Sequence, residues 1–236
     1  MLTHLLRIER KKTFRSIYYW FMHAILFAFI SIIYAWLVNE HLENPQDIQE
    51  DIIHPLFAWI ALLGMALAPL FSNHLFHEEQ ENKIWNLFFQ SKYPLALLGL
   101  AKFINQTFML SIYLTIFSLL PLSLCLKTHS SIFHLALSFS GVWLFLAAQL
   151  ALGLFCVNLF KNKIFSSLLH FFLVIGLSTL ELSNRFQLFS PIYRLKNFLN
   201  GFFHSGDLIY FILIIFICVG ASCYGIKAQI FKTNSY

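Results

Sequence analysis

Seven polar or ionisable side chains stand inside the long apolar segments of this sequence, where they could touch a ligand. They are His23, Asn105, Gln106, His134, Gln149, His170 and Glu181. Such groups are costly in lipid and normally face a cavity or a partner helix, although Asn and Gln also serve as interhelical hydrogen-bonding residues. The candidates for ligand contact are Gln106, Gln149 and His170. The two glutamines rank first because they lie far from the segment ends.

The chemistry that these residues could support is binding rather than catalysis. The sequence has no HExxH pair, no matched aspartates and no glycine-rich phosphate loop, so it predicts neither intramembrane hydrolysis nor ATP hydrolysis by this chain. Its cysteines show no CxxC or Cys/His spacing, and we expect no metal, cofactor or disulfide. The net charge of +5 is not gathered into one stripe, and we expect no binding of nucleic acid.

The elements that must position these residues are membrane-spanning helices. Hydrophobic residues make up 58% of the chain and charged residues only 11%, against about 25% charged in soluble domains. Continuous apolar runs of the length that crosses a bilayer predict helices, because open strands cannot satisfy their backbone in lipid. The sequence predicts an all-α polytopic membrane protein, a single transmembrane domain over 1–236, with spans near 17–38, 55–76, 95–126 (bent or partly embedded), 132–159, 164–182 and 208–231.

Between the second and third spans lies the stretch LFHEEQENKIWNLFFQSKYP, residues 75–94. The acidic residues Glu78 and Glu79 suit the first turn of a helix. Apolar side chains then follow at helical spacing; they are Ile84, Trp85, Leu87 and Phe88. We predict a short amphipathic helix over 77–94, which could contact another protein, the bundle itself or the membrane surface.

The basic residues indicate the orientation of the chain. With the first residues inside the cell, the inner segments hold Arg7, Arg10, Lys11, Lys12, Arg15, Lys83, Lys92, Lys102, Lys161, Lys163, Lys227 and Lys232. The outer segments hold only Lys127, Arg185, Arg194 and Lys196. We therefore expect both termini and residues 77–94 to be cytoplasmic. Residues 1–16 mix leucines with basic residues and are either an interfacial helix or a simple positive anchor.

Residues 75–102 resemble the transmembrane subunit of an ABC transporter of the ABC-2 type. That family has a run L-F-x-E-E-x-x-x-G-T-L-E-L-L-L-T-S-P before a helix that begins near L-G-K. The matching positions here are Leu75, Phe76, Glu78, Glu79, Leu87, Phe88, Ser91 and Lys102, whereas Lys83 and Asn86 depart from it. Residues 150–169 resemble a second family segment at Gly153, Leu154, Phe155, Leu159 and Asn162.

A third stretch favours the gliding-motility-type permeases within that family. Residues 190–211 resemble their S-P-x-x-x-F-x-x-F-x-x-G-x-x-x-x-x-D-x-x-Y-F run at Ser190, Pro191, Phe198, Gly201, Asp207, Tyr210 and Phe211. The haem-exporter B subunit of cytochrome c maturation is a related second choice, because RIERKKTFR near the start and LAKF at 100–103 resemble it too.

The resemblance implies a permease subunit, and an exporter, in the inner membrane of a bacterium. Residues 77–94 would be the coupling helix that docks into a separate ABC ATPase subunit. Six spans make half a transporter, so the expected partners are that ATPase and a second copy or a second permease. The alternative is a membrane protein that docks a partner and transports nothing. Residues 183–207, apolar but carrying Arg194 and Lys196, would form an outer re-entrant or surface helix.

Overall fold

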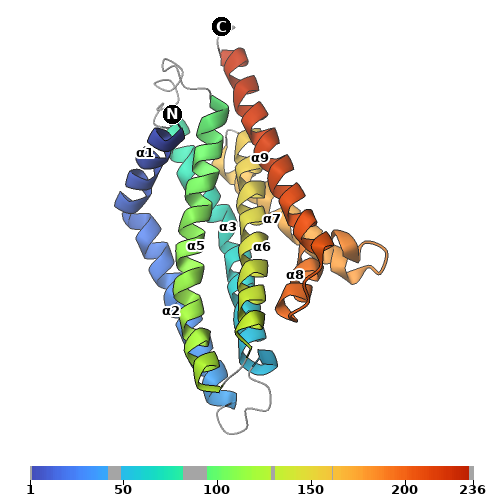
Figure 1. Ribbon diagram of the computed structural model, residues 1–236. Coiled ribbons are helices and arrows are strands. Elements are labelled where there is room, and N and C mark those ends of the chain that lie inside the picture. Colours follow the sequence, from blue (N-terminus) through green and yellow to red (C-terminus); the bar gives the residue numbers. More distant parts are fainter. Residues whose placement is uncertain (1, 42–48, 82–94, 129–130, 161, 234–236) are drawn as a thin grey trace.

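The chain forms an up-and-down bundle of long apolar helices. The computed structural model describes residues 2–41, 49–81, 95–128, 131–160 and 162–233. The long helices are α2 (Ile17–His41), α3 (His54–Glu81), α5 (Leu95–Thr128), α6 (Ile132–Leu159), α7 (Lys163–Thr179) and α9 (Ser205–Thr233). Each contains a stretch long and apolar enough to cross a bilayer, so the protein is an all-α polytopic membrane protein with six candidate spans (Figure 1).

The predicted spans agree with these helices and differ mainly at their ends. The fourth span coincides with α6, and the third is one helix, α5, with Pro121 inside it. The second differs most, because α3 continues through Glu81 instead of ending at residue 76. Glu78 and Glu79 therefore lie at the end of α3. No proline or glycine stands between residues 70 and 81 to stop the helix there.

Helix α6 forms the centre of the bundle. It contacts α3, α5, α7, α8 and α9 (Figure 1), and 78% of its apolar stretch is buried, against 17% for α2. Small residues let neighbouring helices approach it closely; they include Gly141, Ala147, Ala148 and Ala151, all buried. The outer helices α2 and α7 expose large apolar side chains such as Phe29 and Phe172. This surface is typical of helices that face lipid.

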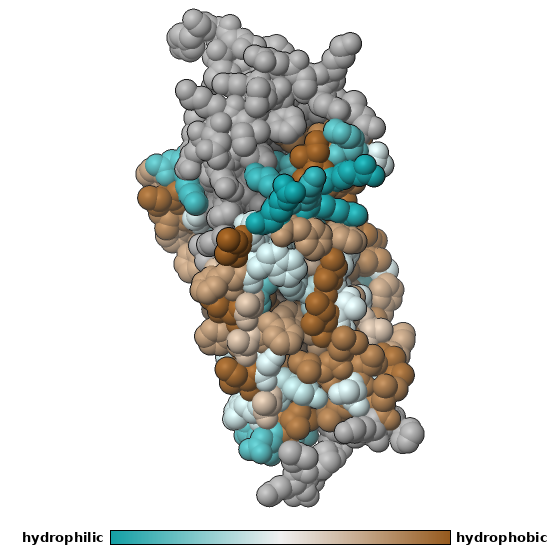
Figure 2. All heavy atoms as spheres, turned by 90° about the vertical axis from the view of Figure 1, so that its left-hand side faces the viewer, coloured by the Kyte–Doolittle hydropathy of each residue, from teal (hydrophilic) through white to brown (hydrophobic). Residues whose placement is uncertain are grey.

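The short helix α1 (Leu2–Arg15) packs against the beginning of α5. Leu5, Leu98 and Ala101 form a small apolar cluster between them. Helix α1 and the last turns of α9 lie at the same end of the bundle (Figure 1). Hydrophilic side chains gather over α1, and an apolar surface extends away from them (Figure 2). The segment predicted over 1–16 is thus a helix at one end of the apolar belt.

The segment between α7 and α9 is a compact helical turn. After the 3-10 turns η2 (Leu180–Leu182) and η3 (Gln187–Phe189), Ser190 accepts a hydrogen bond from the Tyr193 backbone N–H, and Pro191 begins α8 (Pro191–Leu199). Both residue types favour a helix start. Gly201 ends the turn with a φ of 78°, a conformation that favours glycine. Helix α8 lies on the flank of the bundle away from α2 (Figure 1).

Candidate functional site

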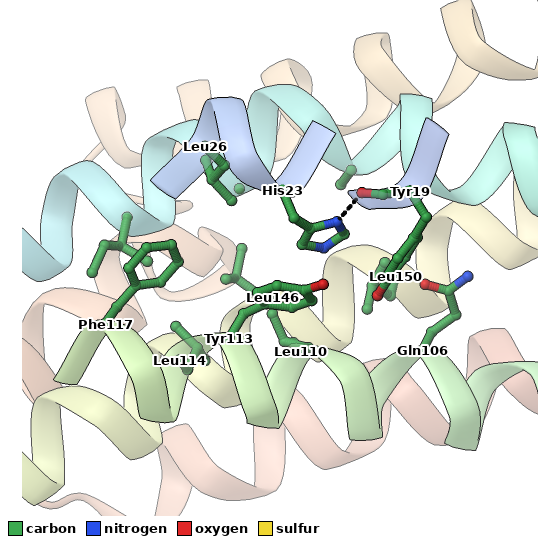
Figure 3. Close-up of a pocket in the computed structure, with 13 residues that line it drawn as sticks. Tyr19, His23, Leu26, Gln106, Leu110, Tyr113, Leu114, Phe117, Leu146 and Leu150 are labelled. Carbon is green, nitrogen blue, oxygen red and sulfur yellow. Dashed lines mark hydrogen bonds between the residues drawn. The ribbon is translucent and has the colours of Figure 1, made fainter. Parts of the chain in front are cut away.

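A cavity lies between α2, α3, α5 and α6, which line it (Figure 3). The cavity has a volume of about 60 Å³, which is room for about four water molecules. Thirteen residues line it, of which four carry polar groups: Tyr19, His23, Gln106 and Tyr113. The other nine are apolar or glycine, and none of the thirteen is Asp, Glu, Lys or Arg. The cavity is therefore amphipathic and uncharged.

Helical periodicity brings these side chains together. Tyr19 and His23 are four residues apart on α2, so they share a face. On α5 the lining residues Gln106, Tyr113 and Phe117 recur at intervals of seven and four, again one face of a helix. Gly64 lets α3 approach Leu146 of α6 closely, because a Cβ at residue 64 would lie 2.5 Å from Leu146 Cδ2.

The polar end of the cavity is built around the His23 ring. Its Nδ1 lies 2.6 Å from the backbone oxygen of Tyr19, so Nδ1–H donates and the neutral ring carries its acceptor lone pair on Nε2. The ring stacks on Tyr113 with centroids 3.7 Å apart and an interplanar angle of 22°. These contacts hold the imidazole in one orientation at the cavity wall.

The rings of Tyr19 and Tyr113 also lie close to each other, with centroids 6.1 Å apart. Gln106 lies beside Tyr19, whereas Leu26, Leu114 and Phe117 lie at the opposite end (Figure 3). The cavity thus has a hydrogen-bonding end and an apolar end. The hydrogen-bonding end is nearer to α1, because Tyr19 is close to the beginning of α2 and Gln106 to the beginning of α5.

The other two candidates for ligand contact lie elsewhere, at the interface of α6 and α7. Gln149 and His170 are each 1% exposed. The His170 ring faces the backbone of Gln149 without a hydrogen bond of good geometry, and within the described residues neither its ring nitrogens nor Gln149 Oε1 has a hydrogen-bond partner. The structure brings these two together and separates both from Gln106, which lies in the cavity.

The remaining polar residues of the apolar segments make structural contacts. Asn105 points away from the cavity and donates from Nδ2 to Thr13 Oγ1 of α1 at 2.9 Å. Near it, Lys102 and Glu9 form a buried ion pair with Nζ and Oε1 3.7 Å apart. Glu181 pairs with Lys196 of α8. His134 packs against Gly201.

A polar network joins α8 to the beginning of α9. The carboxylate of Asp207 is 1% exposed and accepts hydrogen bonds from Arg194 Nη1 at 2.5 Å and from Asn197 Nδ2 at 2.7 Å. Arg194 also donates from Nε to the backbone oxygen of Leu188 at 2.9 Å. These contacts fix the helical turn predicted over 183–207, and their charges are satisfied within it.

Sequence reasoning named Gln106 and His23 but missed Tyr19 and Tyr113. Tyr19 precedes His23 by four residues and Tyr113 follows Gln106 by seven, so each tyrosine shares a helical face with one of the named residues. This spacing is the signal that could have identified them. Of the predicted coupling segment 77–94, residues 82–94 lie outside the described residues, and these include Ile84, Trp85, Leu87 and Phe88.

No model of a protein family matches this chain, and no curated protein sequence matches it either.

Proposed function

We propose that this protein is the membrane-spanning permease subunit of an ABC transporter of the ABC-2 type, and that it works as an exporter with a separate ATPase subunit. The observation that carries the proposal is the pattern Leu-Phe-x-Glu-Glu at 75–79, in the last turns of the second of six apolar helices, with its continuation to Lys102 in the third. This is the register in which the resembling family places its coupling helix.

The arrangement of the bundle supports this assignment. Residues 82–94 connect α3 to α5 along the chain, and both helices form walls of the cavity. A force applied to this connection by an ATPase would therefore act on two walls at once. Since packed helices move as rigid bodies, a small displacement of α3 and α5 against α6 would change the cavity's shape.

The proposed orientation places α1 and the end of α9 in the bacterial cytoplasm. Helix α1 carries Arg7, Lys11 and Arg15 on its surface, and cytoplasmic ends of membrane helices are enriched in such residues. The exposed apolar surfaces of α2 and α7 would contact lipid. A second copy of this chain or a related permease would complete the transporter.

The test is purification of the protein from its native membrane, followed by measurement of ATP turnover. We expect an ATPase to co-purify, and we expect Trp85→Ala and Phe88→Ala each to lower ATP turnover at least tenfold. Phe172→Ala, on the exposed face of α7, is the matched control and should leave turnover unchanged. Recovery without any ATPase, together with unchanged turnover in both variants, would indicate a docking protein that transports nothing.

A further inference from the structure

We propose that the cavity between α2, α3, α5 and α6 is a binding site for an uncharged, single-chain amphiphile with a hydroxyl head. The head would lie among Tyr19, His23, Gln106 and Tyr113, and the chain would extend towards Phe117 (Figure 3). The proposal goes beyond transport and does not require an ATPase, because it concerns binding to one bundle.

The absence of charge in the lining sets the charge of the ligand. None of the thirteen lining residues is Asp, Glu, Lys or Arg. A carboxylate or an ammonium group placed there would lose its hydration without gaining a partner of opposite charge, which is strongly unfavourable. A neutral head loses far less on transfer from water. The site therefore discriminates against ionised amphiphiles with the same chain.

The polar end suits a hydroxyl group. Two phenols, an imidazole and a primary amide supply both donors and acceptors. A hydroxyl is itself one donor and an acceptor, so it can pair with these groups in either direction. His23 is held by its bond to the Tyr19 backbone and by stacking on Tyr113, so this end is already ordered before a ligand arrives.

The apolar end suits a hydrocarbon chain. Gln106 and Phe117 are eleven residues apart on α5, which at about 1.5 Å per residue corresponds to about 16 Å of helix. A cavity of about 60 Å³ that extends over this length is narrow. It fits a single hydrocarbon chain better than a fused ring system. Helix α2 has only 17% of its apolar stretch buried, so it is the wall that can yield to a ligand arriving from the bilayer.

The test is photolabelling of the full-length protein in phosphatidylcholine nanodiscs with an octanol that carries a diazirine. Adducts on Tyr19, Tyr113 or Leu114 report the cavity, and adducts on the exposed face of α7 at Phe172 report probe dissolved in the lipid. We expect cavity labelling to saturate and to be competed by 1-octanol. Octanoate and octyltrimethylammonium should need at least tenfold higher concentrations. Equal competition by either ion, or cavity labelling that only tracks labelling at Phe172, would overturn the proposal.

A pair of tyrosine variants tests the head group. Tyr113→Phe should weaken competition by 1-octanol about three- to tenfold, the effect of losing one neutral hydrogen bond. Tyr34→Phe is the matched control, because Tyr34 is also a spanning-helix tyrosine but bonds the backbone oxygen of Leu120 outside the cavity. Equal effects in both variants would contradict a head bound at Tyr113. If a variant fails to fold, the competition experiments with unmodified ligands on the wild-type protein still test the proposal.

Two sources of the same chemistry can be separated in the same assay. A hydroxyl head on a single chain occurs in free alcohols and in monoacylglycerols. Stronger competition by monooctanoylglycerol than by 1-octanol would assign the site to a membrane lipid, and the reverse order would assign it to a free alcohol. Either order supports the proposal, whereas failure of both to compete would overturn it. None of these results depends on recovery of an ATPase, so this proposal and the proposed function can fail separately.

Discussion

Few charged side chains are buried among the residues that the structure describes, and the clearest example at the level of single residues is the pair formed by Glu9 and Lys102. Their side chains are 7% and 3% exposed, respectively. The pair joins α1 to α5 beside two further contacts, from Asn105 to Thr13 and from the Arg10 guanidinium to the Phe108 ring, 4.1 Å from its centroid. A buried ion pair is costly to form. Removal of only one of the two residues is more costly, because the charge that remains loses that partner.

We therefore expect Lys102→Met to lower the free energy of unfolding by about 3 kcal/mol, because it removes the cation that lies beside the buried Glu9 carboxylate. Thermal unfolding in detergent, followed by size-exclusion recovery, measures the effect. Lys196→Met is the matched control: the Lys196 side chain is 54% exposed in its pair with Glu181, and we expect a loss below about 1 kcal/mol. Equal losses would show that Glu9 does not depend on Lys102.

At the scale of elements, the docking of α8 on α6 depends on one glycine. A Cβ at Gly141 would lie 2.3 Å from Phe198 Cβ, an atom close to the backbone that cannot rotate away. Phe198 is buried and packs against Phe203 and Phe211. The distance between α6 and α8 is thus set by the absence of a side chain at residue 141, and α8 in turn is tied to α9 through Asp207.

Gly141→Ala should displace α8 and lower the free energy of unfolding by about 1–3 kcal/mol, the usual cost of overpacking. It should also speed cleavage by trypsin after Arg185, which is already exposed. Gly176→Ala is the control, because a Cβ there meets nothing within 4 Å, and alanine is favoured over glycine in a helix by about 0.5–1 kcal/mol. An equally destabilised Gly176→Ala protein would refute the packing argument.

At the scale of the whole molecule, the two ends of the bundle differ in charge. The basic surface of α1 lies at the end where α5 begins, and Glu40 is exposed near the far end of α2. If the charge bias sets the orientation, these two ends face opposite sides of the membrane. The even number of spans then places α1 and the end of α9 on the same side.

Labelling of single cysteines tests this orientation, in a protein whose four native cysteines are replaced by alanine. A maleimide that cannot cross membranes should label Glu40→Cys in intact cells. It should label His4→Cys only after the membrane is opened. Both positions are exposed, so accessibility within the protein does not separate them. Labelling of His4→Cys from outside would invert the orientation and would remove the basis for a cytoplasmic ATPase partner.

The number of long apolar helices and their approximate limits could be predicted from the sequence. Length and apolar composition suffice for this, because a backbone in lipid must satisfy its own hydrogen bonds and only a helix of about 20 residues does so. The limits of α6 followed from the same signals. The other spans differ at their ends, and most at α3, where polar residues continue the helix through Glu81.

The sequence does not predict which polar side chains contact one another, because these contacts depend on how the helices pack. Helices such as α2, α5 and α6 are apolar on nearly every side, so their sequences do not show which face turns inward. Gln106 lines the cavity with Tyr19 of α2, its neighbour Asn105 contacts α1, and Gln149 meets His170 at another interface. Each of these contacts depends on how one helix is rotated against the next.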